Sequence, residues 1–211
     1  MTLGVTVTHL QIGDSATATQ NFMLGAQKEN GSLLLQRGNS MAATQNILSI
    51  NKNNVIKLEA GLLQFPATQV PSTDPNTLDD YKEGTWTPAF SLATPGTSSF
   101  GTYVTQVGKY SKIGNTVIAQ FYLKAGTFAL GTGTGNIRIS LPPFTVSATG
   151  GVAGEVGMAL AFTTNAPDSV FAVAASQYVE LYALSGTSHV VLNQTNCATN
   201  MEIFGTVTYY V

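Results

Sequence analysis

The sequence predicts an all-β protein, and three observations lead to that class. Only 9% of the 211 residues are charged, against about 25% in a typical soluble domain. This composition disfavours surface helices, which need Glu, Lys, Arg and Ala, and suits strands, whose exposed face accepts Thr, Ser, Gln and Asn. Apolar and polar residues also alternate in short runs bounded by turn residues, and no useful helical period occurs.

The first 70 residues predict short strands that pair as hairpins. The turn between two of them contains Asn30-Gly31, which suits a hairpin because both residues tolerate positive φ. Isolated hairpins are not stable, so these need either a shared sheet or the same hairpins of neighbouring chains. The scarcity of apolar residues favours neighbouring chains. Strands are expected at residues 2–9, 21–27, 32–38, 47–50 and 55–58, with loops at 13–20 and 51–54.

A change of composition marks the linker. Residues 66–75, PATQVPSTDP, contain three prolines and no periodicity, which is typical of a linker. The chain is therefore expected to divide into an N-terminal β-hairpin region at 1–70, a linker or hinge at 71–87, and a C-terminal domain at 88–211.

The C-terminal domain is predicted to be a β-sandwich of jelly-roll or related type. After a tight turn at Gly114-Asn115, Val117, Ala119, Phe121 and Leu123 alternate with polar or outward-facing neighbours. The same pattern recurs along the domain between Gly, Asn, Pro and Ser residues. About eight strands are expected, within residues 100–114, 115–126, 135–143, 154–162, 169–176, 177–184, 188–194 and 201–211.

The stretch LDDYKEGTWTPAF, residues 78–90, holds four charged residues and the only tryptophan. Adjacent aspartates on an extended chain point in opposite directions, and the alternate-acid spacing of a calcium loop is absent. We therefore predict a turn whose carboxylates accept backbone N–H bonds or stay hydrated, with the tryptophan filling the base of the sandwich and a glycine permitting the turn. The predicted hinge residues are Asp79, Asp80, Tyr81, Gly84, Trp86 and Pro88.

No catalytic, cofactor-binding or metal-binding residue is predicted. A single cysteine, Cys197, allows neither an intrachain disulfide nor a cysteine zinc cluster, and His9 and His189 lie in settings that suggest no catalytic triad. Nine basic residues without a basic run argue against binding to nucleic acid. Without a long apolar segment or a signal-like N-terminus, neither membrane insertion nor secretion is expected.

The exposed surface suggests contacts with other molecules. A monomer with so few charged residues is expected to be poorly soluble. Much of the surface is therefore expected to be buried between subunits. Most aromatic residues on the predicted strands are expected in the core or at subunit contacts. Any that stay exposed beside Asn and Thr loops could stack on sugars, but the sequence identifies no receptor-contact residue.

Three motifs, LDDYKEGTWTP, GTYVTQVGKYSKIGNTVIAQFYL and IRISLPPF, resemble the C-terminal module of bacteriophage tail-fibre and related virion proteins. That family typically has an opening L-D-x-Y-E-E-G-T-W-T-P motif, then aromatic and apolar strands and a Leu-Pro turn. Lys82 stands where an acidic residue is common. The resemblance covers about residues 78–145. It implies a homotrimer, attachment to the virion, recognition of the host surface by the C-terminal tip, and no catalytic residue.

The sequence thus predicts a structural virion protein, a phage tail fibre or spike that attaches to the host cell surface as a homotrimer. Its expected partners are other virion proteins, bound through the N-terminal region, and a host surface glycan or protein. Assembly in the host cytoplasm agrees with a single reduced thiol. A head fibre or capsid decoration protein is the alternative. A polysaccharide depolymerase, disfavoured by the short chain and the lack of separated carboxylates, and a free lectin-like module are less favoured.

Overall fold

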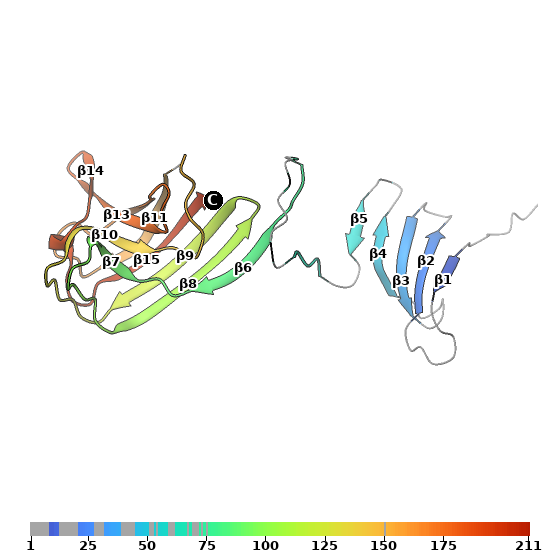
Figure 1. Ribbon diagram of the computed structural model, residues 1–211, viewed down its shortest axis with the longest axis horizontal. Helices are drawn as coiled ribbons and strands as arrows, with labels where there is room; N and C mark the ends of the chain where they lie inside the picture. Colours follow the sequence, from blue (N-terminus) through green and yellow to red (C-terminus); the bar gives the residue numbers. More distant parts are fainter. Residues whose placement is uncertain are drawn as a thin grey trace, which may run out of the picture. The chain divides into compact units, whose positions relative to one another are not determined.

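The computed structural model divides the chain into two compact units, residues 1–64 and 65–211 (Figure 1). The predicted all-β class is confirmed: the described regular structure is β apart from one 3₁₀ turn, η1, Gln194–Asn196. The residues described are 9–12, 21–27, 32–38, 45–50, 53, 55–58, 62–66, 68, 72, 74, 76–149 and 151–211.

The described strands of the first unit form a five-stranded antiparallel sheet in chain order. The second and third strands pair from Asn21 opposite Gly38 to Gln27 opposite Ser32, and the third also pairs with the fourth. Both hairpins therefore join one sheet of this chain, which is the first of the two arrangements considered from the sequence. Of the expected strand at 2–9, only His9 belongs to the described residues, as the first residue of β1. The expected loop at 13–20 lies outside them. The strands are β1 His9–Ile12, β2 Asn21–Gln27, β3 Ser32–Gly38, β4 Gln45–Ile50 and β5 Ile56–Leu58.

The second unit is a ten-stranded antiparallel sheet in the order β6-β8-β9-β15-β11-β12-β13-β10-β7, with β14 paired to β13. All eight strands expected in this region are present, and β6 and β7 are additional. The strands are β6 Tyr81–Trp86, β7 Phe90–Thr94, β8 Tyr103–Ile113, β9 Thr116–Ala125, β10 Thr134–Ser140, β11 Val152–Leu160, β12 Ser169–Ala172, β13 Tyr178–Ser185, β14 Ser188–Val191 and β15 Glu202–Tyr210.

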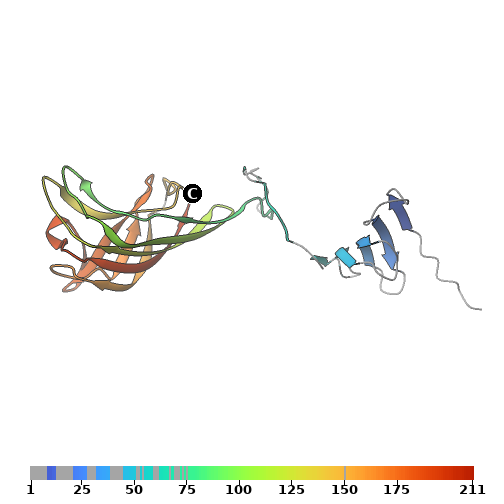
Figure 2. The ribbon, with the colours of Figure 1, turned by 90° about the horizontal axis from the view of Figure 1, so that it is seen from below.

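The sheet curls because its two edge strands are consecutive in the chain. β6 is the first strand in the strand order and β7 is the last. Only residues 87–89 separate these two strands in the chain. Ser140 at the end of β10 joins the edges: its carbonyl accepts the Trp86 indole N–H at 3.0 Å, and its hydroxyl accepts the Ala89 N–H at 3.0 Å. Figures 1 and 2 show the resulting curl. The expected sandwich is therefore one continuous sheet whose halves face each other, rather than two separate sheets.

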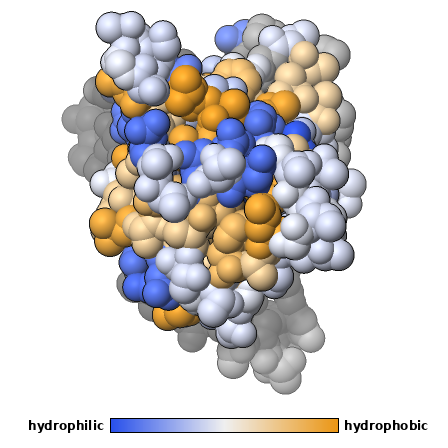
Figure 3. Space-filling view, turned by 90° about the vertical axis from the view of Figure 1, so that its left-hand side faces the viewer, coloured by the Kyte–Doolittle hydropathy of each residue, from blue (hydrophilic) through white to orange (hydrophobic). Residues whose placement is uncertain are grey.

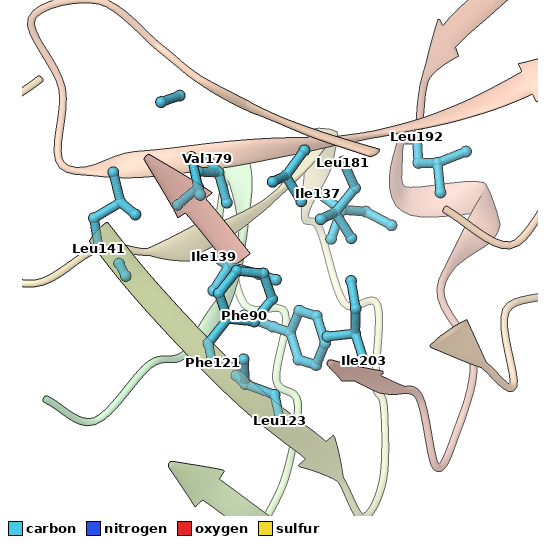
Figure 4. Close-up of a cluster of buried hydrophobic side chains, with 14 of the residues drawn as sticks. Phe90, Phe121, Leu123, Ile137, Ile139, Leu141, Val179, Leu181, Leu192 and Ile203 are labelled. Carbon is cyan, nitrogen blue, oxygen red and sulfur yellow. The ribbon is translucent and has the colours of Figure 1, made fainter. Parts of the chain in front are cut away.

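The core lies inside the curl. Along β9, Val117, Ala119, Phe121 and Leu123 are fully buried, as their alternation predicts. Ile203 on the neighbouring strand β15 extends this buried row. Ile137 and Ile139 on β10, with Val179 and Leu181 on β13, complete the cluster in Figure 4. A period of two is enough to bury one face of each strand, and the curl turns all these faces toward one interior.

The predicted linker is shorter than expected, because residues 81–86 form β6 and pair with β8 from Tyr81 opposite Ile113 to Trp86 opposite Gly108. Gly84 is correspondingly not a turn residue. A Cβ atom there would lie 2.5 Å from the hydroxyl of Tyr110, so the glycine makes room for an aromatic ring. The charges in this stretch obscure the strand pattern. Charged side chains are, however, typical of an edge strand, where they oppose pairing with other chains.

Candidate functional site

The acidic residues of the predicted hinge serve the fold. Asp79 accepts the Ser72 N–H at 2.7 Å through its carboxylate, as expected of a carboxylate that ties the backbone. Asp80 is instead buried and forms an ion pair with the Nζ of Lys112 on β8. Lys112 also donates to the carbonyl of Gly114. The expectation of a hydrated acidic turn is therefore wrong for Asp80, because a cation 32 residues away in the chain is brought beside it.

The remaining hinge residues are spread along the same edge and do not converge on a common site. The Tyr81 hydroxyl donates to Glu83 on the exposed side of β6, and this hydrogen bond raises the tyrosine pKa. Pro88 is buried, and its carbonyl accepts a hydrogen bond from Gln106 Nε2 at 3.0 Å. Trp86 is partly buried against the core. These contacts give the stretch a structural role in holding the edge of the sheet.

Cys197 is buried directly after η1. Burial raises the pKa of its thiol to about 12. The thiolate is the reactive form of cysteine, so this thiol is protonated and inert near neutral pH. We expect iodoacetamide at about pH 8 to modify Cys197 slowly in the native protein and at least about tenfold faster after denaturation, as measured by intact mass. Equal rates in the two states would contradict the burial.

Within the described part of the chain, no group of three or more His, Cys, Asp or Glu side chains is placed to hold a metal ion. No helix long and apolar enough to cross a membrane occurs among those residues either.

A shallow cleft on the outer surface of β11–β14 is the best candidate for a binding site. The strand register places Ala153 opposite Phe171, and Ser169 opposite Tyr182, with all four side chains outside the core. The cleft has a volume of about 410 Å³, within the range of roughly 300–1,000 Å³ common for small-ligand sites. It is lined by Ala153, Ser169, Val170, Phe171, Tyr182 and His189.

Two aromatic rings form the apolar part of this cleft. Phe171 and Tyr182 meet edge to face, with ring centroids 6.1 Å apart and planes at 70°. Their neighbours Val170 and Leu181 point into the core, so alternation obliges both rings to face outward. The ring of Phe171 stays 37% exposed. This pair is an apolar platform that remains accessible from solvent.

An oriented histidine lies at the polar side of the cleft. His189 Nε2 lies 3.3 Å from Asp168 Oδ1. The same carboxylate accepts hydrogen bonds from Ser169 Oγ and from the Leu184 N–H, each at 2.8 Å. With Nε2 directed at Asp168, Nδ1 of His189 has no hydrogen-bond partner among the described residues. The imidazole can therefore offer that nitrogen to a ligand.

The carboxylate that orients His189 stays ionised. Partial burial by itself raises the pKa of Asp168, but the hydrogen bonds from Ser169 and Leu184 and the proximity of His189 outweigh it, so the pKa lies below its usual value. Because the pKa of Asp168 is lower in the folded state than in the unfolded state, its ionised carboxylate stabilises the fold at any pH above the unfolded-state pKa. This stabilisation is lost as the pH falls through the folded-state pKa.

The aromatic and polar surface continues from the cleft across β13 to β10. The register places Phe171 opposite Glu180, and Glu180 opposite Arg138. Arg138 lies 4.0 Å above the ring of Tyr178. The Glu180 carboxylate accepts hydrogen bonds from Arg138 Nε at 3.1 Å and Asn136 Nδ2 at 2.8 Å. On the end of the unit shown in Figure 3, hydrophobic patches likewise alternate with hydrophilic ones.

The chemistry of the cleft suits binding. An aromatic platform with a few fixed polar groups is the usual form of a site for a neutral, amphipathic ligand. Glycoside hydrolysis, by contrast, uses two carboxyl groups free to act on either side of a bond. The carboxylates of Asp168 and Glu180 both accept hydrogen bonds from protein groups.

No local pattern in the sequence points to this cleft. Phe171 and Tyr182 were grouped with strand aromatics expected mostly in the core, and His189 was expected to form no catalytic triad. The signal that could have placed both rings on the outer face is alternation along the strand: Phe171 and Tyr182 directly follow Val170 and Leu181, which point into the core. The approach of His189 to Asp168 depends on the pairing of β12, β13 and β14, which no local pattern reveals.

The geometry defines a class of protein, an all-β protein with an aromatic cleft on the outer face of a curled sheet. No protein-family model and no curated protein sequence matches this chain.

Proposed function

We propose that this protein is a phage tail fibre or spike protein that attaches to the host cell surface as a homotrimer, and that the Phe171–Tyr182 cleft binds a surface glycan. The observation that carries the glycan assignment is the aromatic platform beside an imidazole held by Asp168. The virion assignment is supported by the resemblance of residues 78–145 to phage fibre modules and by the low charge of the chain.

The cleft has the chemistry that a pyranose ring requires. The apolar face of the sugar would stack on one of the two rings, and the other ring, inclined at 70°, would contact its edge, because aromatic rings offer a large rigid surface. A ring hydroxyl would donate to Nδ1 of His189, whose orientation is already set by Asp168. Weak binding at one shallow cleft would be strengthened by three copies acting together on one host surface.

The two-unit organisation fits an attachment protein. The second unit carries the cleft, while the first contributes a separate five-stranded sheet. In the proposed protein the first unit binds other virion proteins, so that the second is presented to the host.

Replacing Tyr182 or His189 by Ala is expected to weaken glycan binding at least about tenfold, a loss of about 1.4 kcal/mol. The measurement is binding of the full chain to a glycan array made from host surface polysaccharides, followed by titration of the best ligand. Tyr81→Ala is the matched control, because Tyr81 is an exposed aromatic residue on β6, away from the cleft lining. Unchanged binding by both cleft variants would remove the glycan site from the proposal.

The virion assignment has its own test. A labelled antibody against the full chain should decorate the tail of the phage particle, and the purified protein should compete with phage for adsorption to host cells. Decoration of the head would instead favour a head fibre or capsid decoration protein. Release of oligosaccharides from host polysaccharide by the purified protein would favour a depolymerase. Absence from the particle would leave a free lectin-like module.

A further inference from the structure

A second outer surface of the C-terminal unit is apolar along one cross-strand row. The register aligns Val107 on β8, Tyr122 on β9, Phe204 on β15 and Met158 on β11. The exposed fractions are 47% for Val107, 48% for Phe204 and 38% for Met158. A hollow of about 250 Å³ lies between Val107, Tyr122 and Phe204. We call the outer side of β8, β9, β15 and β11 the assembly face.

The adjacent row of the assembly face carries opposite charges at its two ends. The register aligns Lys109 on β8, Gln120 on β9, Thr206 on β15 and Glu155 on β11. Lys109 and Glu155 are both exposed, and neither forms an ion pair with another described residue. The row is therefore positive on the β8 side, neutral in the middle and negative on the β11 side.

The other charges of this face are already neutralised within the chain. Lys124 Nζ lies 2.8 Å from Glu202 Oε2, and the hydroxyl of Tyr122 donates to the same carboxylate. Lys124 and Tyr122, through these hydrogen bonds, hold the pKa of Glu202 below its usual value. A partner that covers the apolar row would therefore meet only two charges that lack a counter-ion, those of Lys109 and Glu155.

We propose that the assembly face packs against the same face of a second copy of this chain, with Lys109 of one subunit beside Glu155 of the next. The charge pattern identifies the occupant as another copy, because a surface that is positive at one end and negative at the other complements itself. Apolar residues flanked by complementary charges are also the usual anatomy of a subunit interface.

The charge pattern also restricts the symmetry. Lys109 and Glu155 are separated across the strands, so a rotation axis parallel to the strands places each lysine beside a neighbour's glutamate. An axis across the strands, in the plane of the face, would place like charges together. Twofold and threefold axes along the strands both meet this condition, and a closed ring about such an axis is a common form of homo-oligomer.

This inference rests on the subunit assembly in the proposed function and assigns the surface responsible. The glycan cleft and the assembly face are distinct surfaces: β11 belongs to both, but the platform and the histidine lie on β12, β13 and β14. The two sites can therefore be tested separately.

Charge reversal in the full chain tests the proposal. Lys109→Glu and Glu155→Lys are each expected to raise the dissociation constant of the oligomer at least about tenfold, and the double variant to restore it to within about threefold of the wild type. The measurement is sedimentation velocity over a concentration series. Phe204→Glu, which places a charge in the apolar row, is expected to give monomers. Lys82→Glu on β6, whose register partner is the buried Lys112 of the opposite face, is the matched control and should not change the dissociation constant.

The outcomes separate this inference from the function it rests on. Circular dichroism must show that each variant keeps the wild-type fold. An oligomer that resists Phe204→Glu and both single reversals overturns the assigned surface while the proposed assembly stands. Single variants that dissociate without rescue in the double variant overturn the Lys109–Glu155 pairing. A monomeric wild-type protein overturns both the surface and the trimer, whereas glycan binding by a folded monomeric variant would still support the cleft.

Discussion

Replacing Lys112 by Met is expected to lower the free energy of unfolding of the C-terminal unit by about 3–5 kcal/mol, because it breaks a buried ion pair and leaves one charge uncompensated. Lys112 is only 4% exposed and Asp80 only 8%. Without the ammonium group, the Asp80 carboxylate keeps the cost of its burial and loses its counter-ion. The carbonyl of Gly114 also loses a hydrogen bond from Nζ.

The location of the pair explains why its loss should affect the whole sheet. The Gly114 N–H donates to the backbone carbonyl of Asp80 at 2.9 Å, so side-chain and backbone contacts together tie the turn between β8 and β9 to the start of β6. The effect is measured by urea denaturation, followed by the fluorescence of the only tryptophan, Trp86, on β6.

Two further variants test whether the loss of stability comes from the uncompensated charge of Asp80. Asp80→Leu combined with Lys112→Met removes both charges and should recover most of the lost stability, because a buried pair can often be exchanged for apolar side chains of similar volume. Lys82→Met is the matched control: it removes an exposed cation on β6 whose Nζ lies 5.7 Å from the centroid of the Phe144 ring, and it should cost less than about 1 kcal/mol. A loss below about 1 kcal/mol for Lys112→Met would show that the pair behaves like an exposed ion pair.

Replacing Trp86 by Ala is the second change with a large expected effect, a loss of about 3 kcal/mol. This loss of unfolding free energy is at the lower end of the range for replacing a large aromatic residue by Ala, because the Trp86 indole is only partly buried. Its ring covers Gly108, where an added Cβ would lie 2.5 Å from the indole, and it contacts the ring of Tyr110, with centroids 6.4 Å apart. Removing it would open a cavity between β6 and β8.

The indole also helps to close the sheet. Its N–H donates to the Ser140 carbonyl, 54 residues away in the chain, and so connects edge strand β6 to β10 near the other edge. Trp86→Phe keeps much of the packing and loses this hydrogen bond, so its expected cost is smaller, about 1–2 kcal/mol. Circular dichroism is the measurement here, because Trp86→Ala removes the only tryptophan.

A matched control separates packing from the charges of the same stretch. Asp79→Ala removes one hydrogen bond to the Ser72 N–H and should cost about 0.5–1 kcal/mol. If Asp79→Ala were as costly as Trp86→Ala, the acidic end of the stretch would be as important to the fold as the indole.

Local alternation was sufficient to predict most strands of the C-terminal unit and the inward-facing residues of β9. Val117, Ala119, Phe121 and Leu123 occupy every second position, and a strand exposes alternate residues to the two faces of the sheet. β6 was missed because an edge strand with Lys82 and Glu83 does not show that alternation. Residues 78–90 were therefore interpreted as a hinge, although most of them belong to β6 and to its connection with β7.

The candidate site depended on contacts that no local pattern encodes. Asp168 and His189 approach each other only because β12, β13 and β14 are neighbours in the sheet. Phe171 and Tyr182 likewise form one platform only through the pairing of β12 with β13. The ion pair between Asp80 and Lys112 has the same origin in the pairing of β6 with β8.

The sequence by itself determined the β class, the positions of most strands and the side of each strand that is buried, because the hydrophobic effect acts on a period of two that is readable along the chain. The tertiary structure decided the order of the strands, the curl that brings the β6 and β7 edges together, and the rows of side chains on the outer faces. Strand order is a choice among distant hydrogen-bonding partners. The cleft and the assembly face, which lie across several strands, are consequences of that choice.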